Sequence, residues 1–213
     1  MKGLANRLRL IVIADRGRVH DGELCRRAEE ALDAGAPALQ LRDKASGAGD
    51  GLQIARELAE ACRVRGALFF VNDRLDLALA AGADGVHVGP EDPPVAAIRR
   101  VAGSDFLIGA SAGTTVEAVQ AVADGADYLG CGSVFSTGSK PDAGAPIGLE
   151  GLQAVSRAVD VPVVAIGGLT PETAGLVYET GAAGCAVISA IMGPEPVARA
   201  VRALLAPWTG RDG

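Results

Sequence analysis

AGAPALQLR at residues 34–42 returns in altered form as AGADGVHVG at 81–89, DGADYLGCG at 124–132 and TGAAGCAVIS at 180–189. Each stretch carries a glycine between the end of a helical pattern and the start of an apolar run, at positions 35, 82, 125 and 181. Glycine suits this position because it adopts the left-handed conformation that ends many helices. The stretches fall at every second strand, which indicates a fold built from repeated strand–helix units.

Eight short apolar runs alternate with amphipathic segments along the chain. The runs occupy residues 8–15, 38–43, 67–73, 85–89, 106–111, 128–132, 161–168 and 184–189. They are apolar almost throughout, as is typical of parallel strands that are buried on both faces. One segment between them places Ala55, Leu58, Ala59 and Cys62 on a single face of a helix.

These units predict one α/β domain, a (β/α)8 TIM barrel that spans residues 1–206. An open doubly wound sheet of the flavodoxin or Rossmann type is the alternative. No G-x-G-x-x-G follows the first run, which counts against the Rossmann form. We expect residues 207–213 to form a frayed tail, with Trp208 packed on the last helix.

The composition excludes several classes of partner. The chain has 213 residues, 26 acidic and 20 basic side chains, a net charge of −6 and 3% aromatic residues, so it offers nucleic acid neither a basic field nor stacking platforms. No apolar run reaches the roughly 18 residues of a membrane span. The first residues lack a cleavage pattern, and the four cysteines lack metal-finger spacing and suit buried positions. We expect a cytoplasmic protein that binds no nucleic acid and no membrane and that can form a homo-oligomer.

Polar residues gather where the strands end, the face at which barrels of this kind carry their sites. They are Asp15, Arg42, Asp43, Lys44, Asn72, Asp73, Glu91, Asp92, Ser111, Lys140 in the loop 133–144, and Ser189. The seventh strand instead ends in a glycine pair, Gly167 and Gly168. Asp73 and Asp92 follow neighbouring strands. Two carboxylates held side by side suit Mg²⁺, which shares its other positions with phosphate oxygens. Capping of the following helices is the alternative role for each acid.

Three cations on the same face, Arg42, Lys44 and Lys140, indicate a clamp for a diphosphate. Their alternative role is that of solvated charges on the rim. The pair Gly167-Gly168 and the following strand end at Ser189 fit a second phosphate site, since loops after the seventh and eighth strands often bind phosphate in this fold. The glycine pair can also serve close packing alone.

The remaining polar groups are neutral. Gln40, Asn72 and Ser111 can orient a polar heterocycle, and structural hydrogen bonds are the alternative for Gln40 and Ser111. His87 suits the core of the fourth strand and His20 a surface loop, so neither a Ser-His-Asp triad nor a histidine zinc site is predicted. The residues predict an enzyme with a diphosphate held by Mg²⁺ and a separate monophosphate. Transfer of a group from the diphosphate is the chemistry that needs no strong general base.

The sequence resembles the thiamine-phosphate synthase family, also called thiamine-phosphate pyrophosphorylase, over most of its length. The resemblance rests on QLRDK at 40–44, NDRLDLALAAGADGVHVGPED at 72–92, GADYLGCGSVFSTGSKPDAG at 125–144, VAIGGL at 164–169 and VISAI at 187–191. It implies an enzyme that joins 4-amino-2-methyl-5-(diphosphooxymethyl)pyrimidine to a thiazole phosphate. Pyrophosphate leaves in that Mg²⁺-dependent reaction.

Position by position, the resemblance assigns each site residue a role. It implies catalysis by Arg42, Lys44, Ser111 and Lys140, and Mg²⁺ binding by Asp73 and Asp92. The pyrimidine diphosphate would contact Gln40, Leu41, Arg42, Asp43, Lys44, Asn72, Ser111 and Lys140. The thiazole phosphate would contact Thr137, Gly138, Ser139, Gly167, Ile188 and Ser189.

This chain departs from the family at three places. Ala112-Gly113 stands where Thr-His is common, Ser136 where Pro is common, and Ser139 where Thr is common. The alternatives to a synthase are a thiazole tautomerase-like enzyme, a paralogue that senses its ligands without turnover, and a generic phosphate-binding isomerase barrel, for which the sequence offers no acid/base pair. A tautomerase typically lacks the paired metal acids, and this chain keeps both.

Overall fold

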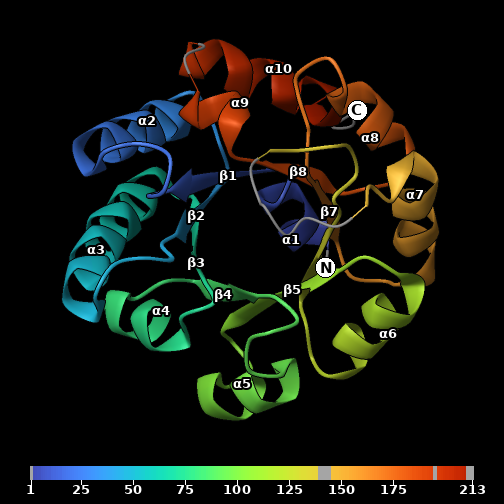
Figure 1. Cartoon of the computed structure of the whole chain (residues 1–213), viewed down its shortest axis with the longest axis horizontal. Helices are drawn as coiled ribbons and strands as arrows, with labels where there is room; N and C mark the ends of the chain where they lie inside the picture. The colour runs from blue at the N-terminus through green and yellow to red at the C-terminus, as the bar shows by residue number, and fades with distance from the viewer. Residues whose placement is uncertain (1, 139–144, 194–195, 210–213) are drawn as a thin grey trace.

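The computed structural model describes residues 2–138, 145–193 and 196–209. Eight parallel strands form a closed barrel in the order β1 to β8, and β8 pairs with β1 (Figure 1). This closure confirms the TIM barrel and excludes the open sheet. The strands are β1 (Leu10–Asp15), β2 (Ala38–Arg42), β3 (Leu68–Asn72), β4 (Gly85–Val88), β5 (Leu107–Ala112), β6 (Tyr128–Cys131), β7 (Val163–Ile166) and β8 (Gly184–Val187).

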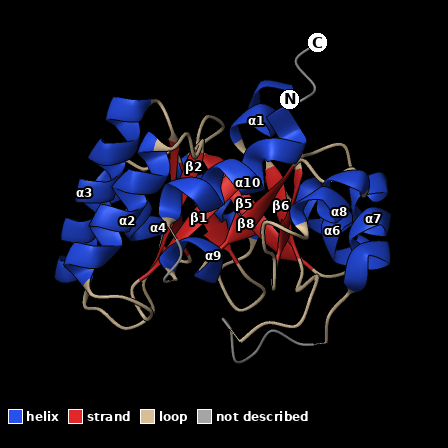
Figure 2. Cartoon of the chain, turned by 90° about the horizontal axis from the view of Figure 1, so that it is seen from above, coloured by secondary structure: helices blue, strands red, loops and turns tan. Residues whose placement is uncertain are grey.

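Helices precede, connect and follow the strands of the barrel. They are α1 (Lys2–Arg7), α2 (Asp21–Asp33), α3 (Ala48–Arg65), α4 (Leu75–Ala81), α5 (Val95–Ala102), α6 (Thr115–Ala123), α7 (Gly148–Ala158), α8 (Ala174–Glu179), α9 (Ser189–Met192) and α10 (Val197–Thr209). Helix α1 precedes β1, helices α9 and α10 follow β8, and the others connect the strands and surround the barrel. Figure 2 shows α1 at one end of the barrel and α9 toward the other. The sequence did not predict α1, whose Leu4 packs against the barrel interior.

The four glycines of the repeated stretches adopt the conformation that their positions predict. Gly35, Gly82, Gly125 and Gly181 have φ of 99°, 71°, 101° and 86°. A side chain there would cost roughly 1–2 kcal/mol of backbone strain. The glycines therefore allow each helix to turn at once into the next strand.

Two apolar layers hold the barrel, because successive strand side chains point to opposite faces. On β2, Ala38 packs in the barrel interior, whereas Leu39 and Leu41 pack outward against the helices. The interior layer also contains Ile11, Ile13, Leu68, Phe70, Tyr128, Val164 and Ile188. Each such buried large side chain contributes about 1.5–3 kcal/mol. The outward layer fixes the helices, and the interior layer forms the floor of the site.

The C-terminal end differs from its prediction. Helix α10 contains Pro207 and Trp208 and ends at Thr209, so the frayed tail is wrong for residues 207–209, while 210–213 lie outside the described part. Trp208 belongs to the last helix itself. Its Nε1 donates to the carbonyl oxygen of Ala182 at 3.1 Å, and its ring meets Tyr178 of α8 edge-on. These two contacts hold the end of α10 on the barrel.

The cysteines are free thiols, as their spacing predicts. Cys62, Cys131 and Cys185 are buried, and Cys25 is half-buried. Within the described residues, no helix combines the length and the apolar character that a bilayer crossing requires.

Candidate active site

A cavity of about 360 Å³ opens at the carboxyl ends of the strands. Most of the predicted site residues line it: Arg42, Lys44, Asn72, Asp73, Asp92, Ser111, Thr137, Gly167, Ile188 and Ser189. Glu91, His87, Ser133, Ile166, Gly168 and Leu169 complete much of the wall. One cavity thus contains acids, cations, a glycine pair and an apolar surface.

Other predicted residues do not face this cavity. Leu41 is buried in the outward layer, and the Asp43 side chain points to the loop that follows β2. Gln40 is buried behind the cavity, where its Nε2 donates to Asn72 Oδ1 at 2.9 Å. Gly138 is exposed, and its carbonyl oxygen accepts a bond from Arg18 at 2.8 Å. Ser139 and Lys140 lie outside the described residues.

The two predicted metal acids face each other across the ends of β3 and β4. Their carboxyl groups lie within hydrogen-bonding reach, and the Lys44 ammonium forms an ion pair with Asp73. Asp73 has a φ of 64°, a left-handed conformation that is rare for a residue other than glycine. Such strain is tolerated mainly where the position of the side chain matters.

Helix capping, the alternative role for these acids, is wrong. Helix α4 follows Arg74 and helix α5 follows Pro94, and neither helix has a side-chain cap. The Asp92 carboxylate instead accepts a bond from the N–H of Gly89 at 2.7 Å, which holds it inside its own loop. Both acids are therefore positioned toward the cavity rather than toward a helix end.

The pKa values of the two carboxyl groups are shifted in opposite directions. Burial raises the pKa of Asp73, but the Lys44 ammonium and the neighbouring Asp92 carboxyl outweigh burial and hold the pKa below its usual range. Burial also raises the pKa of Asp92; the Gly89 N–H opposes this, but the Asp73 charge adds to it, so the pKa lies above its usual range. Two carboxyl groups in this arrangement favour a cation that binds both.

Arg42 is not a solvated rim charge. Its Nη1 lies 2.9 Å from an oxygen of Asp15, and the side chains are 16% and 4% exposed. Its Nε is buried and has no hydrogen-bond partner within the described part of the chain. The sequence places Asp15 at the end of a strand but assigns it no function. In the structure its carboxylate holds the Arg42 guanidinium at the cavity.

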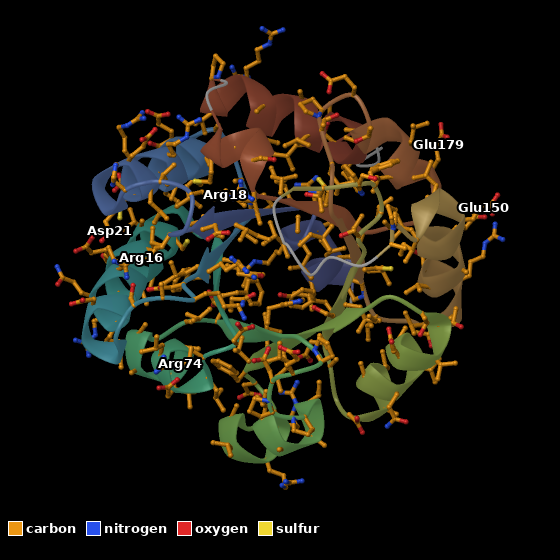
Figure 3. All side chains as sticks on the ribbon, viewed as in Figure 1. Arg16, Arg18, Asp21, Arg74, Glu150 and Glu179 are labelled. Carbon is orange, nitrogen blue, oxygen red and sulfur yellow. The ribbon has the colours of Figure 1, made fainter. Side chains whose placement is uncertain are left out.

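Arg16 organises the loop that carries Lys44. Its Nη1 donates to Asp43 Oδ2 at 2.6 Å and to Ser46 Oγ at 2.5 Å, and its other nitrogens bind both oxygens of Asp21. Figure 3 shows Arg16 and Asp21 together near α2 and α3, with Arg18 nearer the barrel axis. Sequence analysis missed this network, because Arg16 follows a strand end without any charge pattern that marks it.

Gly167 and Gly168 bring the loop after β6 against the end of β7. They have φ of 98° and 66°, and a Cβ on Gly167 would lie 2.6 Å from Ser133. The N–H of Phe135 donates to the carbonyl oxygen of Gly167 at 3.1 Å. Close packing, one of the two alternatives for this pair, is thus present. The pair also lines the cavity opposite the acids.

His87 lies inside the barrel, as its strand position predicts, and it also lines the cavity. Its two ring nitrogens each lie 3.1 Å from a hydroxyl oxygen, that of Tyr128 and that of Ser111. His20 is exposed at the start of α2. The departures at Ala112 and Gly113 lie outside the cavity wall, where the Gly113 N–H donates to a carboxylate oxygen of Glu117 at 2.7 Å.

Comparison with known proteins places this site in a family. The model of the thiamine monophosphate synthase family matches residues 10–191. The chain belongs to this family. The match covers every strand and the described cavity residues, and it confirms the resemblance that the sequence motifs indicated.

Similar members of the family share most of their length with this chain. A thiamine-phosphate synthase of Moorella thermoacetica is 53% identical over 82% of this chain and 83% of its own. One from Chloroflexus aurantiacus is 46% identical over 93% and 91%. The solved thiamine phosphate pyrophosphorylase of Pyrococcus furiosus has a TM-score of 0.88 and 45% identity, over 96% of both chains. The prediction of an enzyme of thiamine biosynthesis, a transferase, is confirmed.

Proposed function

We propose that this family member couples 4-amino-2-methyl-5-(diphosphooxymethyl)pyrimidine to a thiazole phosphate and releases thiamine phosphate and pyrophosphate. The observation that carries the proposal is the composition of the cavity at the carboxyl ends of the strands. Arg42, Lys44 and the acid pair occupy one side, and Gly167 and Ser189 occupy the other. Relatives named thiamine-phosphate synthase support the same reaction.

The bond changes are simple. The C–O bond between the pyrimidine methylene carbon and the diphosphate breaks, and both electrons leave on pyrophosphate. The lone pair of the thiazole nitrogen then forms the new C–N bond. No proton has to be removed, so the protein needs to hold two ligands in line and to stabilise negative charge on the departing group.

The diphosphate side has the groups for that task. Arg42, held by Asp15, presents a planar set of donors, and Lys44, which is ion-paired with Asp73, adds a charge that is 57% exposed. Asn72 receives the Gln40 amide on its oxygen, so its own NH₂ group can donate to a pyrimidine ring nitrogen. These residues bind the leaving group and orient the ring.

The residues present fit Mg²⁺. Asp73 and Asp92 would supply two hard oxygen ligands from one cluster. The described residues contain no group of three or more metal-binding side chains, so the protein would provide only these two ligands. Water and substrate phosphate would fill the remaining positions, as is usual for this ion. Bound there, Mg²⁺ would neutralise charge on the diphosphate. The ion stays a prediction.

The thiazole side has an apolar wall and polar ends. Ile166, Leu169 and Ile188 line the cavity beside the glycine pair. An aromatic five-membered ring fits such a wall, and Thr137 and Ser189, which also line the cavity, are polar residues that can contact a phosphate. The thiazole phosphate therefore belongs at the ends of β7 and β8.

The test is formation of thiamine phosphate by the purified protein from both substrates, with and without Mg²⁺. Asp92→Asn should lower kcat about 100-fold or more. The matched control is Asp105→Asn, an exposed acid that precedes β5 at the opposite end of the barrel. Near-native turnover by Asp92→Asn would refute its role as metal ligand.

The alternatives have distinct outcomes in the same assay. Binding of both ligands without product would indicate the ligand-sensing paralogue, and isomerisation of the thiazole alone would indicate the tautomerase-like enzyme. The cytoplasmic location and the homo-oligomer remain predictions from sequence.

A further inference from the structure

Three polar side chains form a line from the barrel core to the cavity. The hydroxyl of Tyr128 on β6 lies 3.1 Å from Nδ1 of His87 on β4. Nε2 of the same ring lies 3.1 Å from Oγ of Ser111 on β5. Tyr128 is 0% exposed, whereas Ser111 is exposed in the cavity. The line thus connects the solvent-excluded hydroxyl of Tyr128 to the hydroxyl of Ser111, which a ligand in the cavity can reach.

Two glycines make room for this line. A Cβ on Gly109 would lie 2.2 Å from Cζ of Tyr128 and 2.5 Å from Nδ1 of His87. A Cβ on Gly130 would lie 2.8 Å from Cε1 of His87. Phe70 packs against the Tyr128 ring with a centroid separation of 5.3 Å. The two rings are thus confined to one arrangement by backbone and side chains.

The chemistry of the groups sets the direction of the hydrogen bonds. Burial raises the pKa of Tyr128 well above its usual range, so the hydroxyl keeps its proton. A phenol is a better donor than acceptor, and a neutral imidazole has one acceptor nitrogen and one N–H. If Tyr128 donates to Nδ1, the hydrogen of His87 is on Nε2 and is donated to Ser111 Oγ. The hydrogen of the Ser111 hydroxyl then points away from His87.

We infer that Tyr128 and His87 are positioning residues that fix the Ser111 hydroxyl as a hydrogen-bond donor toward the cavity. The inference rests on the proposed function for the identity of the acceptor, an oxygen of the pyrimidine diphosphate. A fixed donor stabilises the negative charge that grows on this group as the C–O bond breaks. We call the two hydrogen bonds that run from Tyr128 through His87 to Ser111 the relay. Without it, the Ser111 hydroxyl could donate its hydrogen either to His87 or to the substrate.

The first test measures the tautomer and needs no substrate. The chain has two histidines, so labelling with 15N-histidine gives signals from His20 and His87, and His20→Gln assigns them. We expect His87 with a protonated Nε2 and an unprotonated Nδ1, and a changed tautomer balance in Tyr128→Phe. A hydrogen on Nδ1, alone or together with Nε2, would overturn the inference whatever reaction the protein catalyses.

The second test is a double-mutant cycle on turnover. Tyr128→Phe should lower kcat about fivefold to tenfold, the effect of one misplaced hydrogen bond, and leave KM for both substrates nearly unchanged. In the Ser111→Ala background the same substitution should have no further effect, because it acts only through Ser111. An equal loss in both backgrounds would show that Tyr128 acts on the fold instead.

Controls separate this result from misfolding. Tyr178→Phe removes a hydroxyl from α8, outside the cavity wall, and should keep the wild-type rate. His87→Gln keeps an N–H donor near Ser111 and should retain more kcat than His87→Leu. Equal rates in these two variants would count against the relay. If the wild-type protein makes no thiamine phosphate, the proposed function fails while the tautomer measurement still decides the relay.

Discussion

The network around Arg16 allows a stability change to be worked out from the structure. Arg16→Met keeps much of the side-chain stem and removes every bond of the guanidinium. The Asp21 part contributes about 1 kcal/mol or less, because that carboxylate is 49% exposed. Asp43 is 7% exposed and would lose its guanidinium partner, keeping the Ser46 side chain and the N–H groups of its loop, which costs about 2–3 kcal/mol. We expect Arg16→Met to lower the free energy of unfolding by about 3 kcal/mol.

Arg74→Met is the matched control. Arg74 binds both oxygens of Asp76 at 2.8 and 2.6 Å, much as Arg16 binds Asp21, but these side chains are 40% and 63% exposed. Its loss should cost below about 1 kcal/mol. Urea unfolding followed by circular dichroism measures the free energy of unfolding of both variants. The slope of this free energy against urea concentration, m, should be the same as in the wild type. If Arg16→Met costs no more than Arg74→Met, the buried contact with Asp43 contributes nothing.

The same network predicts a pH dependence. Burial raises the pKa of Asp43, but the Arg16 guanidinium and the N–H groups of the loop outweigh burial and hold the pKa below its usual value. A lowered pKa gives stability that is present above the unfolded value of roughly 3.9 and is lost as pH falls through the folded pKa. The difference between wild type and Arg16→Met should therefore shrink below about pH 4. A constant difference would contradict an ionised Asp43.

Three further outcomes are expected. Asp15→Asn should raise KM for the pyrimidine diphosphate about tenfold in steady-state kinetics, because Arg42 loses its charged anchor; an unchanged KM would contradict the anchor. Gly167→Ala should destabilise the protein more than Gly35→Ala in thermal unfolding. Both glycines have φ near 98–99°, but only at Gly167 would the new Cβ meet a neighbour, a serine side chain at 2.6 Å. Cys25 should react slowly with a thiol reagent near pH 8 and faster toward pH 11, because burial raises its pKa to about 11.

The strands and the end of the barrel that carries the site could be predicted from the sequence. Strands buried on both faces need apolar residues throughout, so each left an apolar run followed by polar residues. Helix α1 left no comparable pattern, because its place depends on Leu4 packing against the barrel interior. Helix α10 continues past Pro207 because Trp208 is held by a hydrogen bond to Ala182 and a ring contact with Tyr178, two residues that are distant from it in sequence. Both misses are tertiary effects that override local propensity.

The contacts within the site could not be predicted, because they join residues distant in sequence. Asp15 and Arg42 are 27 residues apart, and Gln40 and Asn72 are 32 apart. The pairing register of the strands decides which of these side chains meet: Asp15 lies opposite Arg42 across β1 and β2. The interpretation of His87 as a core residue holds only in part, because the side chain lies inside the barrel but is half-buried and lines the cavity. It missed the relay, since a single strand position does not show which hydroxyls face it.

The motif QLRDK shows why the residues of one motif do not all face the same cavity. Side chains alternate across a strand, so Gln40 and Arg42 point to the barrel axis and Leu41 points to the helices. Asp43 continues this alternation and binds Arg16 instead of the cavity. The motif therefore combines two kinds of constraint. Of its inward residues, Arg42 lines the cavity and Gln40 holds Asn72, and its outward residues are set by packing and by the ion pair of Asp43 with Arg16.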